Sequence, residues 1–472
     1  MIRFESFSHM LEYCAKAQPG AAALRCAGTV LSFAELDEKV RALADQFASG
    51  KSTCLAVLAD GSMECVINIL AANSAGLSVA MLDPSLPEDL LAKLISHTEA
   101  DALWTSDAEL AEILEPAVKA PQKSMANGCE EECEAQQKAS DLMLFFTSGT
   151  TSSSKAVVLT GKSLCSSAWN GSQMLPLGPG DTLLCMLPLA HVFGFVCGLL
   201  WGLSCGACVA LGQGMRTYIS DFKLYRPTAV SVVPALLGFL LKADALNPEL
   251  KTLLIGAGDC PPQLIEAAKA KGIGVSFGYG LTETSSGVAI STGGDPYAMD
   301  ICPDDSIAIA EDGEVLIYAP TCMMQGYWMD PESTKAAFCC EGSKEGRPEG
   351  RIFLKSGDLG SLDEDGRLHI TGRKKDMLVL SDGTKIFLPE YESELAKLLG
   401  NTEFAVDLKS GRPVLICPEE CASEDLLKRL RPAMEKLPRG QQLTGMVTVK
   451  GPLPRTATGK IKRWELRQKA GL

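Results

Sequence analysis

The sequence predicts an α/β protein with a large layered N-terminal unit and a smaller α+β C-terminal unit. Short apolar runs alternate with helical periodicity along most of the chain, which is the pattern of sheets layered with helices. From Glu311 onward the sequence pattern is typical of β-hairpins with Asp-Gly turns. The chain has 472 residues, too many for one small core, and usual domain sizes suggest about two to four folding units.

The elements of the large unit are expected in a regular order. LSFAELDEKVRALADQFA has helical spacing near the N-terminus. Apolar runs of four to eight residues, each closed by Gly, Pro or Asp, suit strands buried on both faces. These runs are TCLAVLA, GLSVAML, ADALWTS, TLLCMLPL, ACVAL, PTAVSVV, TLLIGAGD and IGVSFGYG.

The later elements are hairpins and a charged terminal unit. EDGEVLIYAP and LGSLDEDGRLHITG each carry an Asp-Gly turn, at Asp312-Gly313 and Asp365-Gly366. The polar stretch 121–141 is expected to be a surface connection. A charge-rich unit starts near Arg373, so the predicted domains are 1–372 and 373–472.

Charge and cysteine content restrict the class of partner and the compartment. The formal net charge of −14 argues against nucleic acid, whose backbone is bound by clustered Lys and Arg. The N-terminus lacks the pattern of a secretory signal, so a cytoplasmic location is expected. Eighteen cysteines spread over such a chain predict reduced, mostly buried thiols, and the four histidines lie at no zinc spacing from them.

The segment 192–215 is uncharged, with glycines at every fourth position from Gly194 to Gly206. This spacing occurs in packed transmembrane helices, so a membrane span is one interpretation. No basic flank orients the segment, and the glycines can equally end a buried helix before the strand ACVAL. A buried helix, a turn and a strand are therefore predicted, with no integral membrane segment.

The first candidate motif is a polar loop between two strand-like runs, DLMLFF and KAVVLT. Backbone N–H groups, hydroxyl donors and the ammonium of Lys155 can surround a polyphosphate. The loop differs from a P-loop because no glycine precedes Lys155, so a polar surface hairpin is the alternative. Its leading polar residues are Thr147, Ser148, Gly149, Thr150 and Thr151.

Three further motifs follow along the chain. GYGLTETSS offers Tyr279 for stacking a base and Glu283 as an oxygen ligand for Mg²⁺, although a plain turn after a strand is the alternative. Between residues 355 and 376, Asp358 can bridge two ribose hydroxyls and Arg373 can reach ribose or phosphate oxygens. PLPRTATGKIKRWEL carries Lys460, which on its own could be one more surface lysine.

In this order and at these separations, the four motifs resemble the signatures of the adenylate-forming superfamily, which contains acyl-CoA synthetases, luciferases and peptide-synthetase adenylation domains. The resemblance covers most of the chain and is closest to bacterial acyl-CoA synthetases. It implies a large N-terminal unit with a small barrel-like part and a mobile C-terminal unit. It also implies the reaction: a carboxylate attacks the α-phosphate of ATP, pyrophosphate leaves, and a thiol, here CoA, displaces AMP.

The resemblance implies a role for each motif residue. Those that would hold ATP are Thr147, Ser148, Gly149, Thr150, Thr151, Lys155, Gly256, Ala257, Gly258, Tyr279, Gly280, Asp358 and Arg373. Glu283 and Thr150 would bind Mg²⁺. The residues implied in catalysis are Lys460, Thr282, Glu283 and His191.

Lys460 would bridge the attacking carboxylate and the α-phosphate, where charge develops in the transition state. In the family the small unit then swings to a second pose that admits the thiol, and the hinge position corresponds to Lys375. One site would thereby serve two reactions.

The sequence departs from the family pattern at several positions. Ser152, Ser154 and Ala156 stand where the loop usually has Gly, Pro and Gly, which removes backbone freedom and adds hydroxyls. Phe353 replaces a tryptophan often found before the aspartate, and the stretch after Thr292 is shorter than usual. Because of these departures, the alternative remains that the protein is a homologue that binds nucleotide but no longer catalyses the reaction.

The acid is indicated by residues 188–195, PLAHVFGF, and the acceptor by the resemblance to bacterial acyl-CoA synthetases. This segment has no aspartate to pair the ammonium of an amino acid, an expensive charge to bury alone. His191, Phe193 and Phe195 favour an apolar or aromatic acyl group, although His191 could be a core histidine. CoA is the expected acceptor of a fatty or other apolar acid. The alternatives are an acyl-carrier-protein ligase and an aryl- or succinylbenzoate-type CoA ligase, each as a monomer or homodimer.

Overall fold

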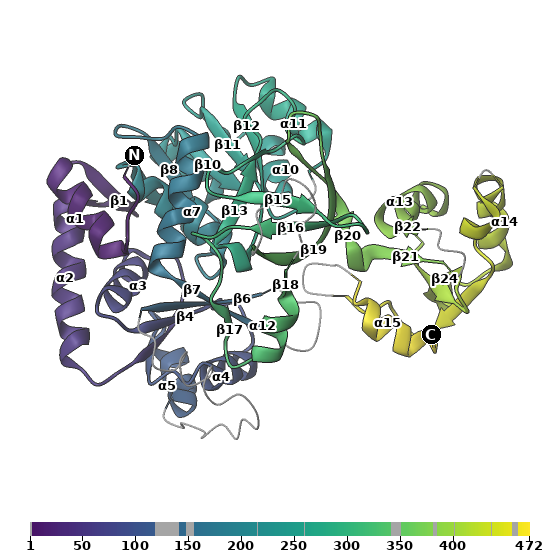
Figure 1. The fold of residues 1–472 in the computed structure, drawn as a ribbon, viewed down its shortest axis with the longest axis horizontal. Coiled ribbons are helices and arrows are strands. Elements are labelled where there is room, and N and C mark those ends of the chain that lie inside the picture. Colours follow the sequence, from purple (N-terminus) through teal and green to yellow (C-terminus); the bar gives the residue numbers. More distant parts are fainter. Residues whose placement is uncertain are drawn as a thin grey trace.

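The computed structural model shows a large body that carries the N-terminus and a smaller unit that ends at the C-terminus (Figure 1). Alternating helices and strands confirm the α/β class. The structure describes residues 2–118, 141–147, 155–214, 216–258, 260–340, 351–380, 385–400, 402–435, 437–455 and 461–472. The expected surface connection at 121–141 lies almost wholly outside these residues.

A nine-stranded sheet forms one half of the large body, in the order β14-β13-β12-β11-β10-β8-β9-β1-β2. Its inner strands run parallel, while β2, β13 and β14 are antiparallel to their neighbours. Strands β9 and β10 are buried along their whole length, as the continuous apolar runs predict. The strands are β1 (Ala22–Cys26), β2 (Thr29–Ser32), β8 (Thr182–Cys185), β9 (Cys208–Leu211), β10 (Ala229–Val232), β11 (Thr252–Ile255), β12 (Gly274–Leu281), β13 (Ser286–Ile290) and β14 (Asp300–Ile301).

A six-stranded sheet forms the other half, in the order β17-β7-β6-β4-β3-β5. Strands β6 and β7 pair antiparallel on either side of the polar loop, which confirms that the loop connects two strands of one sheet. Strand β17 comes from far along the chain and pairs with β7. The strands are β3 (Cys54–Leu58), β4 (Ser78–Leu82), β5 (Ala102–Trp104), β6 (Leu142–Phe146), β7 (Ala156–Thr160) and β17 (Gly326–Tyr327).

Helices fill the space between the two sheets and cover their outer faces. Helix α3 contacts β1 and β4, and α7 contacts β13 and β7, so both lie between the sheets. Helix α2 begins with the capping box of Ser32 and Glu35. The helices are α1 (Phe7–Ala17), α2 (Phe33–Ser49), α3 (Met63–Ser74), α4 (Glu88–His97), α5 (Ala108–Val118), α7 (Gly161–Met174), α8 (Trp201–Ser204), α9 (Tyr218–Tyr225), α10 (Pro234–Lys242), α11 (Pro262–Lys269) and α12 (Pro331–Ala337).

The glycine-rich segment after residue 192 folds as a short buried helix, a turn and a strand. A π-helical stretch, η1 (Gly194–Leu200), runs into α8, and β9 follows. The predicted helix, turn and strand are confirmed. Within the described ranges, no helix has the length and apolar character needed to cross a membrane.

A third sheet of hairpins joins the body to the smaller unit. Both predicted Asp-Gly turns are confirmed, with Gly313 at φ 90° and Gly366 at φ 80° between antiparallel strands. The strands are β15 (Ser306–Ile309), β16 (Glu314–Tyr318), β18 (Phe338–Cys340), β19 (Ile352–Leu362) and β20 (Leu368–Arg373).

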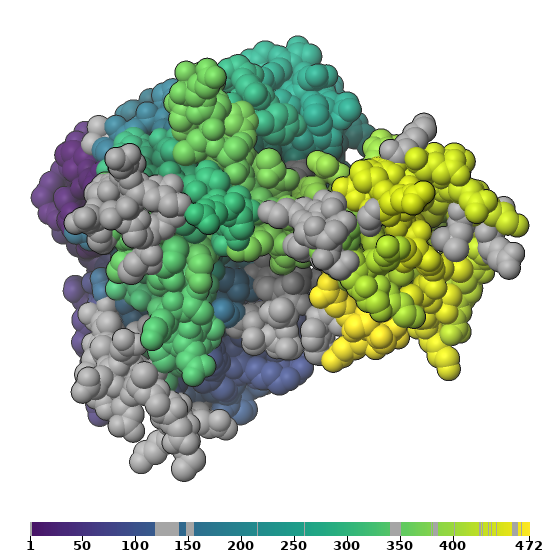
Figure 2. All heavy atoms as spheres, turned by 45° about the vertical axis from the view of Figure 1, so that its right-hand side comes forward, coloured from purple at the N-terminus to yellow at the C-terminus, as the bar shows by residue number. Residues whose placement is uncertain are grey.

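The smaller unit is α+β and has its own apolar core, built from residues after 377. In the space-filling view its yellow atoms form a separate mass at one side of the body (Figure 2). The boundary at residue 372 stays a prediction. The elements are η3 (Lys374–Asp376), β21 (Met377–Val379), β22 (Lys385–Phe387), α13 (Leu388–Leu399), β23 (Ala405–Lys409), β24 (Arg412–Pro418), η4 (Glu419–Cys421), α14 (Glu424–Met434), η5 (Arg439–Gln441), β25 (Met446–Val449) and α15 (Arg463–Ala470).

Candidate active site

Asp358 is the centre of the candidate site, and two distant segments meet at its carboxylate. Oδ2 accepts a hydrogen bond from the hydroxyl of Tyr279 at 2.9 Å, and Oδ1 pairs with Nε of Arg373 at 2.9 Å. Asp358 and Arg373 lie opposite each other in the ladder of β19 and β20. The structure therefore brings together the tyrosine, the aspartate and the arginine that the sequence predicted as nucleotide contacts.

Burial makes this carboxylate unusual. The Asp358 side chain is 4% exposed, whereas that of Arg373 is 51% exposed. Burial raises the pKa of Asp358, although Arg373 and the Tyr279 hydroxyl act in the opposite direction. Burial and the neighbouring carboxylate also raise the pKa of Tyr279 well above its usual value, so its hydroxyl remains a donor. A buried acceptor held in this way suits the hydroxyl groups of a ribose.

The turn after Tyr279 requires a glycine. At Gly280 a Cβ would lie 1.6 Å from the carbonyl oxygen of Ser286, because β12 and β13 shift register between Tyr279 and Gly280. A short 3₁₀ turn, η2 (Thr282–Thr284), follows and presents Thr282 and Glu283 at the end of β12. This bulged turn carries two of the residues that were predicted to act in catalysis, and one of them, Glu283, was also predicted to bind Mg²⁺.

Glu314 holds the backbone next to Asp358. Its carboxylate accepts from the backbone N–H of Gly357 at 2.9 Å and from Nζ of Lys374 at 2.7 Å, and its side chain is 9% exposed. Lys374 also pairs with Asp312 at 2.6 Å. A hollow of about 440 Å³ opens beside this network. It is lined by Ser356, Gly357, Arg373, Lys374 and Lys375.

The chain enters the smaller unit at a crowded glycine. Gly372 has φ +153°, and a Cβ there would lie 2.1 Å from Cζ of Phe387. Phe387 belongs to β22 of the smaller unit, so its ring packs on the backbone of β20. Lys375, the predicted hinge, follows three residues later in η3.

Two hydrogen bonds between Thr147 and Lys155 close the base of the polar loop, one between backbone groups and one to a side-chain hydroxyl. The N–H of Thr147 donates to the carbonyl of Lys155 at 3.0 Å, and the N–H of Lys155 donates to Oγ1 of Thr147 at 3.4 Å. The ammonium of Lys155 lies 4.4 Å from the ring centroid of Tyr327. The Tyr327 hydroxyl donates to Oε1 of Glu283 at 2.8 Å. The predicted phosphate lysine and the predicted metal carboxylate therefore flank one tyrosine.

Several predicted residues lie outside the part of the chain that the structure describes, and their roles stay predictions. They are Ser148, Gly149, Thr150, Thr151, Ser152, Ser154 and Lys460.

One of the segments predicted to hold ATP and the segment predicted to bind the acid meet at Gly256. A Cβ there would lie 2.8 Å from Cζ of Phe193, so the phenyl ring lies against the backbone just after β11. Ala257 follows with φ 62°, and Gly258 completes the turn. His191 is half-exposed, with Nε2 at 4.0 Å from Oδ2 of Asp83, so it is not a core histidine.

The predicted role of Phe195 is wrong. Its side chain is fully buried and packs between the rings of Phe7 and Phe145. The sequence could not separate Phe193 from Phe195, because a π-helical stretch begins between the two residues.

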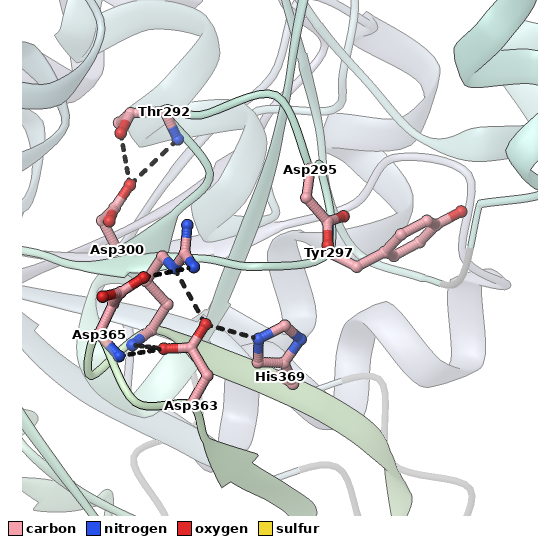
Figure 3. Close-up of polar contacts among 8 residues, drawn as sticks. Thr292, Asp295, Tyr297, Asp300, Asp363, Asp365 and His369 are labelled. Carbon is pink, nitrogen blue, oxygen red and sulfur yellow. Dashed lines mark hydrogen bonds and ion pairs between the residues drawn. The ribbon is translucent and has the colours of Figure 1, made fainter.

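The far end of the β19–β20 hairpin carries a separate polar group (Figure 3). Asp363 accepts from Arg367 at 3.0 Å and lies 3.2 Å from Nε2 of His369. Hydrogen bonding from the backbone N–H of Arg367 lowers the pKa of Asp363 to about 2. In the same view, Asp300 accepts from both the N–H and the hydroxyl of Thr292 and closes the shortened stretch after β13. These contacts stabilise turns at some distance from Asp358.

Solved structures of coenzyme A synthetases share this fold. The chain aligns with the O-succinylbenzoate coenzyme A synthetase of Bacillus subtilis, solved in complex with AMP, with a TM-score of 0.75 and 24% identity over 97% of this chain and 98% of that one. A profile of the family described as AMP-binding enzyme matches residues 11–328. The chain therefore belongs to the AMP-binding enzyme family, which confirms the superfamily predicted from the motifs.

Curated relatives match over nearly the whole chain or most of it. The 2-succinylbenzoate–CoA ligase of Listeria monocytogenes serotype 4b is 27% identical over 98% of this chain and 99% of its own length. The long-chain-fatty-acid–CoA ligase FadD13 of Mycobacterium tuberculosis is 28% identical over 70% of this chain and 67% of its own length. The acids named for these two proteins differ greatly in shape.

Two residues of the site had no distinguishing signal in the sequence. In the sequence, Glu314 looks like an ordinary polar residue after an Asp-Gly turn, and Tyr327 looks like a buried tyrosine of a strand. Their positions depend on pairing between distant segments, β16 with β19 and β17 with β7. No local pattern could have identified them.

Proposed function

We propose that this protein is an AMP-forming acid–CoA ligase, which converts a carboxylic acid to its acyl-adenylate with ATP and then transfers the acyl group to CoA. The observation that carries the proposal is the convergence of Tyr279, Asp358 and Arg373 at one buried carboxylate. Family membership and the names of the curated relatives support the same reaction.

ATP is bound by residues from all three sheets of the large body. Asp358 accepts from the ribose hydroxyls, with Arg373 beside it, and the face of Tyr279 stacks on adenine next to Gly256, Ala257 and Gly258. The polar loop that ends at Lys155 holds the β- and γ-phosphates. Lys460 carries positive charge to the α-phosphate as the carboxylate attacks.

Glu283 fits the Mg²⁺ that accompanies ATP. Oε1 accepts from Tyr327, and among the described residues Oε2 has no hydrogen-bond partner, so one hard oxygen is left to bind the ion. Thr150 would add a second oxygen. When bound, Mg²⁺ neutralises part of the phosphate charge and favours departure of pyrophosphate.

The second step needs a different arrangement of the smaller unit. We propose that residues 373–472 form a mobile domain that turns about Lys375, withdraws Lys460 after adenylation and opens a path for the thiol. The packing of Phe387 on Gly372 and the pairing of Lys374 with Glu314 hold one of the two poses.

The acid is proposed to be apolar or aromatic. Phe193 presents its ring beside Gly256 and His191 is half-exposed nearby in sequence, whereas Phe195 contributes only to the core. Among the acids named for the relatives, 2-succinylbenzoate is an aromatic one and a long-chain fatty acid is an aliphatic one. A cytoplasmic location is proposed because ATP and CoA are both supplied there.

ATP–pyrophosphate exchange with a panel of acids tests the proposal. The panel contains 2-succinylbenzoate, hydroxycinnamic acids, fatty acids of several lengths and a reaction without acid. Exchange that depends on one class of acid identifies the substrate, and addition of CoA or of an acyl carrier protein then identifies the acceptor. ATP binding without exchange for any acid would instead establish the nucleotide-binding homologue that does not turn over.

A further inference from the structure

Tyr327 links the two parts of the site that handle charge. It occupies β17, where it pairs with Val157 of β7, and it is 7% exposed. Its hydroxyl donates to Oε1 of Glu283 at 2.8 Å, and its ring faces the ammonium of Lys155 at 4.4 Å. One side chain thus contacts both residues to which the proposed function gives the metal and the terminal phosphates.

The segment around Tyr327 holds Glu283 at two points. The N–H of Met324 donates to the carbonyl oxygen of Glu283 at 2.8 Å, while the Tyr327 hydroxyl holds its carboxylate. A hydrogen bond to an ionised group is stronger and more directional than one between neutral groups. Glu283 therefore has both its backbone and its side chain fixed by residues 324–327.

Tyr327 is itself rigidly placed. The N–H of Gln325 donates to the carbonyl of Val158 at 2.8 Å, and the N–H of Trp328 donates to that of Ala156 at 2.7 Å. The N–H of Tyr327 donates to Oγ1 of Thr334 at 2.9 Å. Because β7 begins directly after Lys155, the same ladder fixes the distance between the tyrosine and the lysine.

The chemistry of the hydroxyl suits a positioning role. The phenol O–H donates to Oε1 of Glu283 and can hold the carboxylate through a directional hydrogen bond. With Oε1 engaged, rotation of the carboxylate is restrained, and Oε2 accepts no hydrogen bond among the described residues. The aromatic face also attracts the ammonium of Lys155, which limits the positions it samples.

We propose that Tyr327 is a positioning residue that orients Glu283 toward Mg²⁺ and Lys155 toward the terminal phosphates. This inference rests on the proposed function, since it assigns the roles of the two residues on either side. It adds a residue that acts through others and does not touch the nucleotide. Removing a residue that hydrogen-bonds to a metal ligand typically lowers metal affinity or activity by about 10- to 100-fold.

Tyr327→Phe separates the two contacts, because it removes the hydroxyl and keeps the ring. ATP binding is measured by calorimetry on the full-length protein, once with excess MgCl₂ and once with EDTA. We expect the Mg²⁺-dependent gain in ATP affinity to fall about tenfold and the affinity in EDTA to stay the same. Tyr327→Leu, which also removes the ring, is expected to weaken binding under both conditions. Neither measurement requires turnover, so failure of the proposed reaction would leave the result interpretable.

Tyr318→Phe is the matched control. Tyr318 lies on β16, and its hydroxyl takes part in no hydrogen bond among the described residues. A double-mutant cycle with Glu283→Gln completes the test: if Tyr327 acts through Glu283, the double variant loses no more Mg²⁺-dependent affinity than Glu283→Gln alone. The proposal would be overturned if Tyr327→Phe lost the same ATP affinity with and without Mg²⁺, or if the losses of the two single variants were fully additive. A drop of more than about 5 °C in the unfolding midpoint of Tyr327→Phe would also overturn it.

Discussion

Replacing Asp358 by Asn should lower nucleotide affinity while leaving the fold intact. The amide has nearly the same shape, but one of its two polar atoms becomes a donor. It can then no longer accept from both the Tyr279 hydroxyl and the Arg373 guanidinium, which lie at 2.9 Å from separate oxygens. For the same reason, the amide can no longer accept hydrogen bonds through both of its polar atoms from the two hydroxyl groups of a ribose.

The magnitude follows from one lost hydrogen bond to a charged acceptor, about 1.5–3 kcal/mol. This corresponds to about 10- to 100-fold in ATP affinity. Stability should change much less. Burial raises the pKa of Asp358, which means that the folded state disfavours its ionised form, and a neutral amide avoids that cost. Because the folded pKa lies above the unfolded one, the contribution of Asp358 to stability declines as pH rises between the two values.

The assay combines the Michaelis constant for ATP in pyrophosphate exchange, calorimetric ATP binding and urea unfolding. Asp365→Asn is the control, since Asp365 lies at the tip of the same hairpin, is 74% exposed and pairs with Arg367. ATP affinity within threefold of the wild type would refute the ribose role of Asp358. A severe loss of folding stability together with lost binding would show that the carboxylate is mainly structural.

Three further changes have defined outcomes. Lys460→Ala should slow adenylate formation by a few hundredfold, which corresponds to about 3–4 kcal/mol in the activation barrier. It should largely spare thioester formation from a supplied acyl-adenylate, and an equal loss of both steps would contradict the role of Lys460. Gly372→Ala must displace the Phe387 ring, and urea unfolding should show a loss of roughly 1–3 kcal/mol that Gly287→Ala, with open space around it, does not show. Burial raises the pKa of Asp305 to about 8, so wild-type stability should fall by up to about 1.4 kcal/mol per pH unit between pH 6 and 8. Asp305→Asn should remove this part of the slope, and unfolding curves of both proteins with the same pH dependence would contradict it.

The sequence was a good guide to strands and turns because their signals are local. The runs TCLAVLA and GLSVAML became β3 and β4, whose side chains are buried on both faces, and the turns at Gly313 and Gly366 need the positive φ that glycine supplies. Asp358 and Tyr279 could be chosen as partners of one ligand because each stands beside a glycine in a motif of the family.

Residues that act through tertiary pairing could not be predicted in this way. Tyr327 and Glu314 reach the site only because β17 joins β7 and β16 joins β19. Phe193 and Phe195 are two residues apart, yet one lies against Gly256 and the other is in the core. Periodicity was ambiguous there because a π-helical stretch starts between them and changes the angular spacing of the side chains.

The pairing of β1 with β9 has a consequence for synthesis of the chain. Leu24 lies beside Val209 in the nine-stranded sheet and is completely buried there. At about 5–20 residues per second, the ribosome needs roughly 10–40 s to make the segment between these two strands. During that time the β1–β2 hairpin has an unpaired apolar edge, which is a template for pairing with another chain. The N-terminal hairpin is thus open to pairing with other chains until β9 has been synthesised.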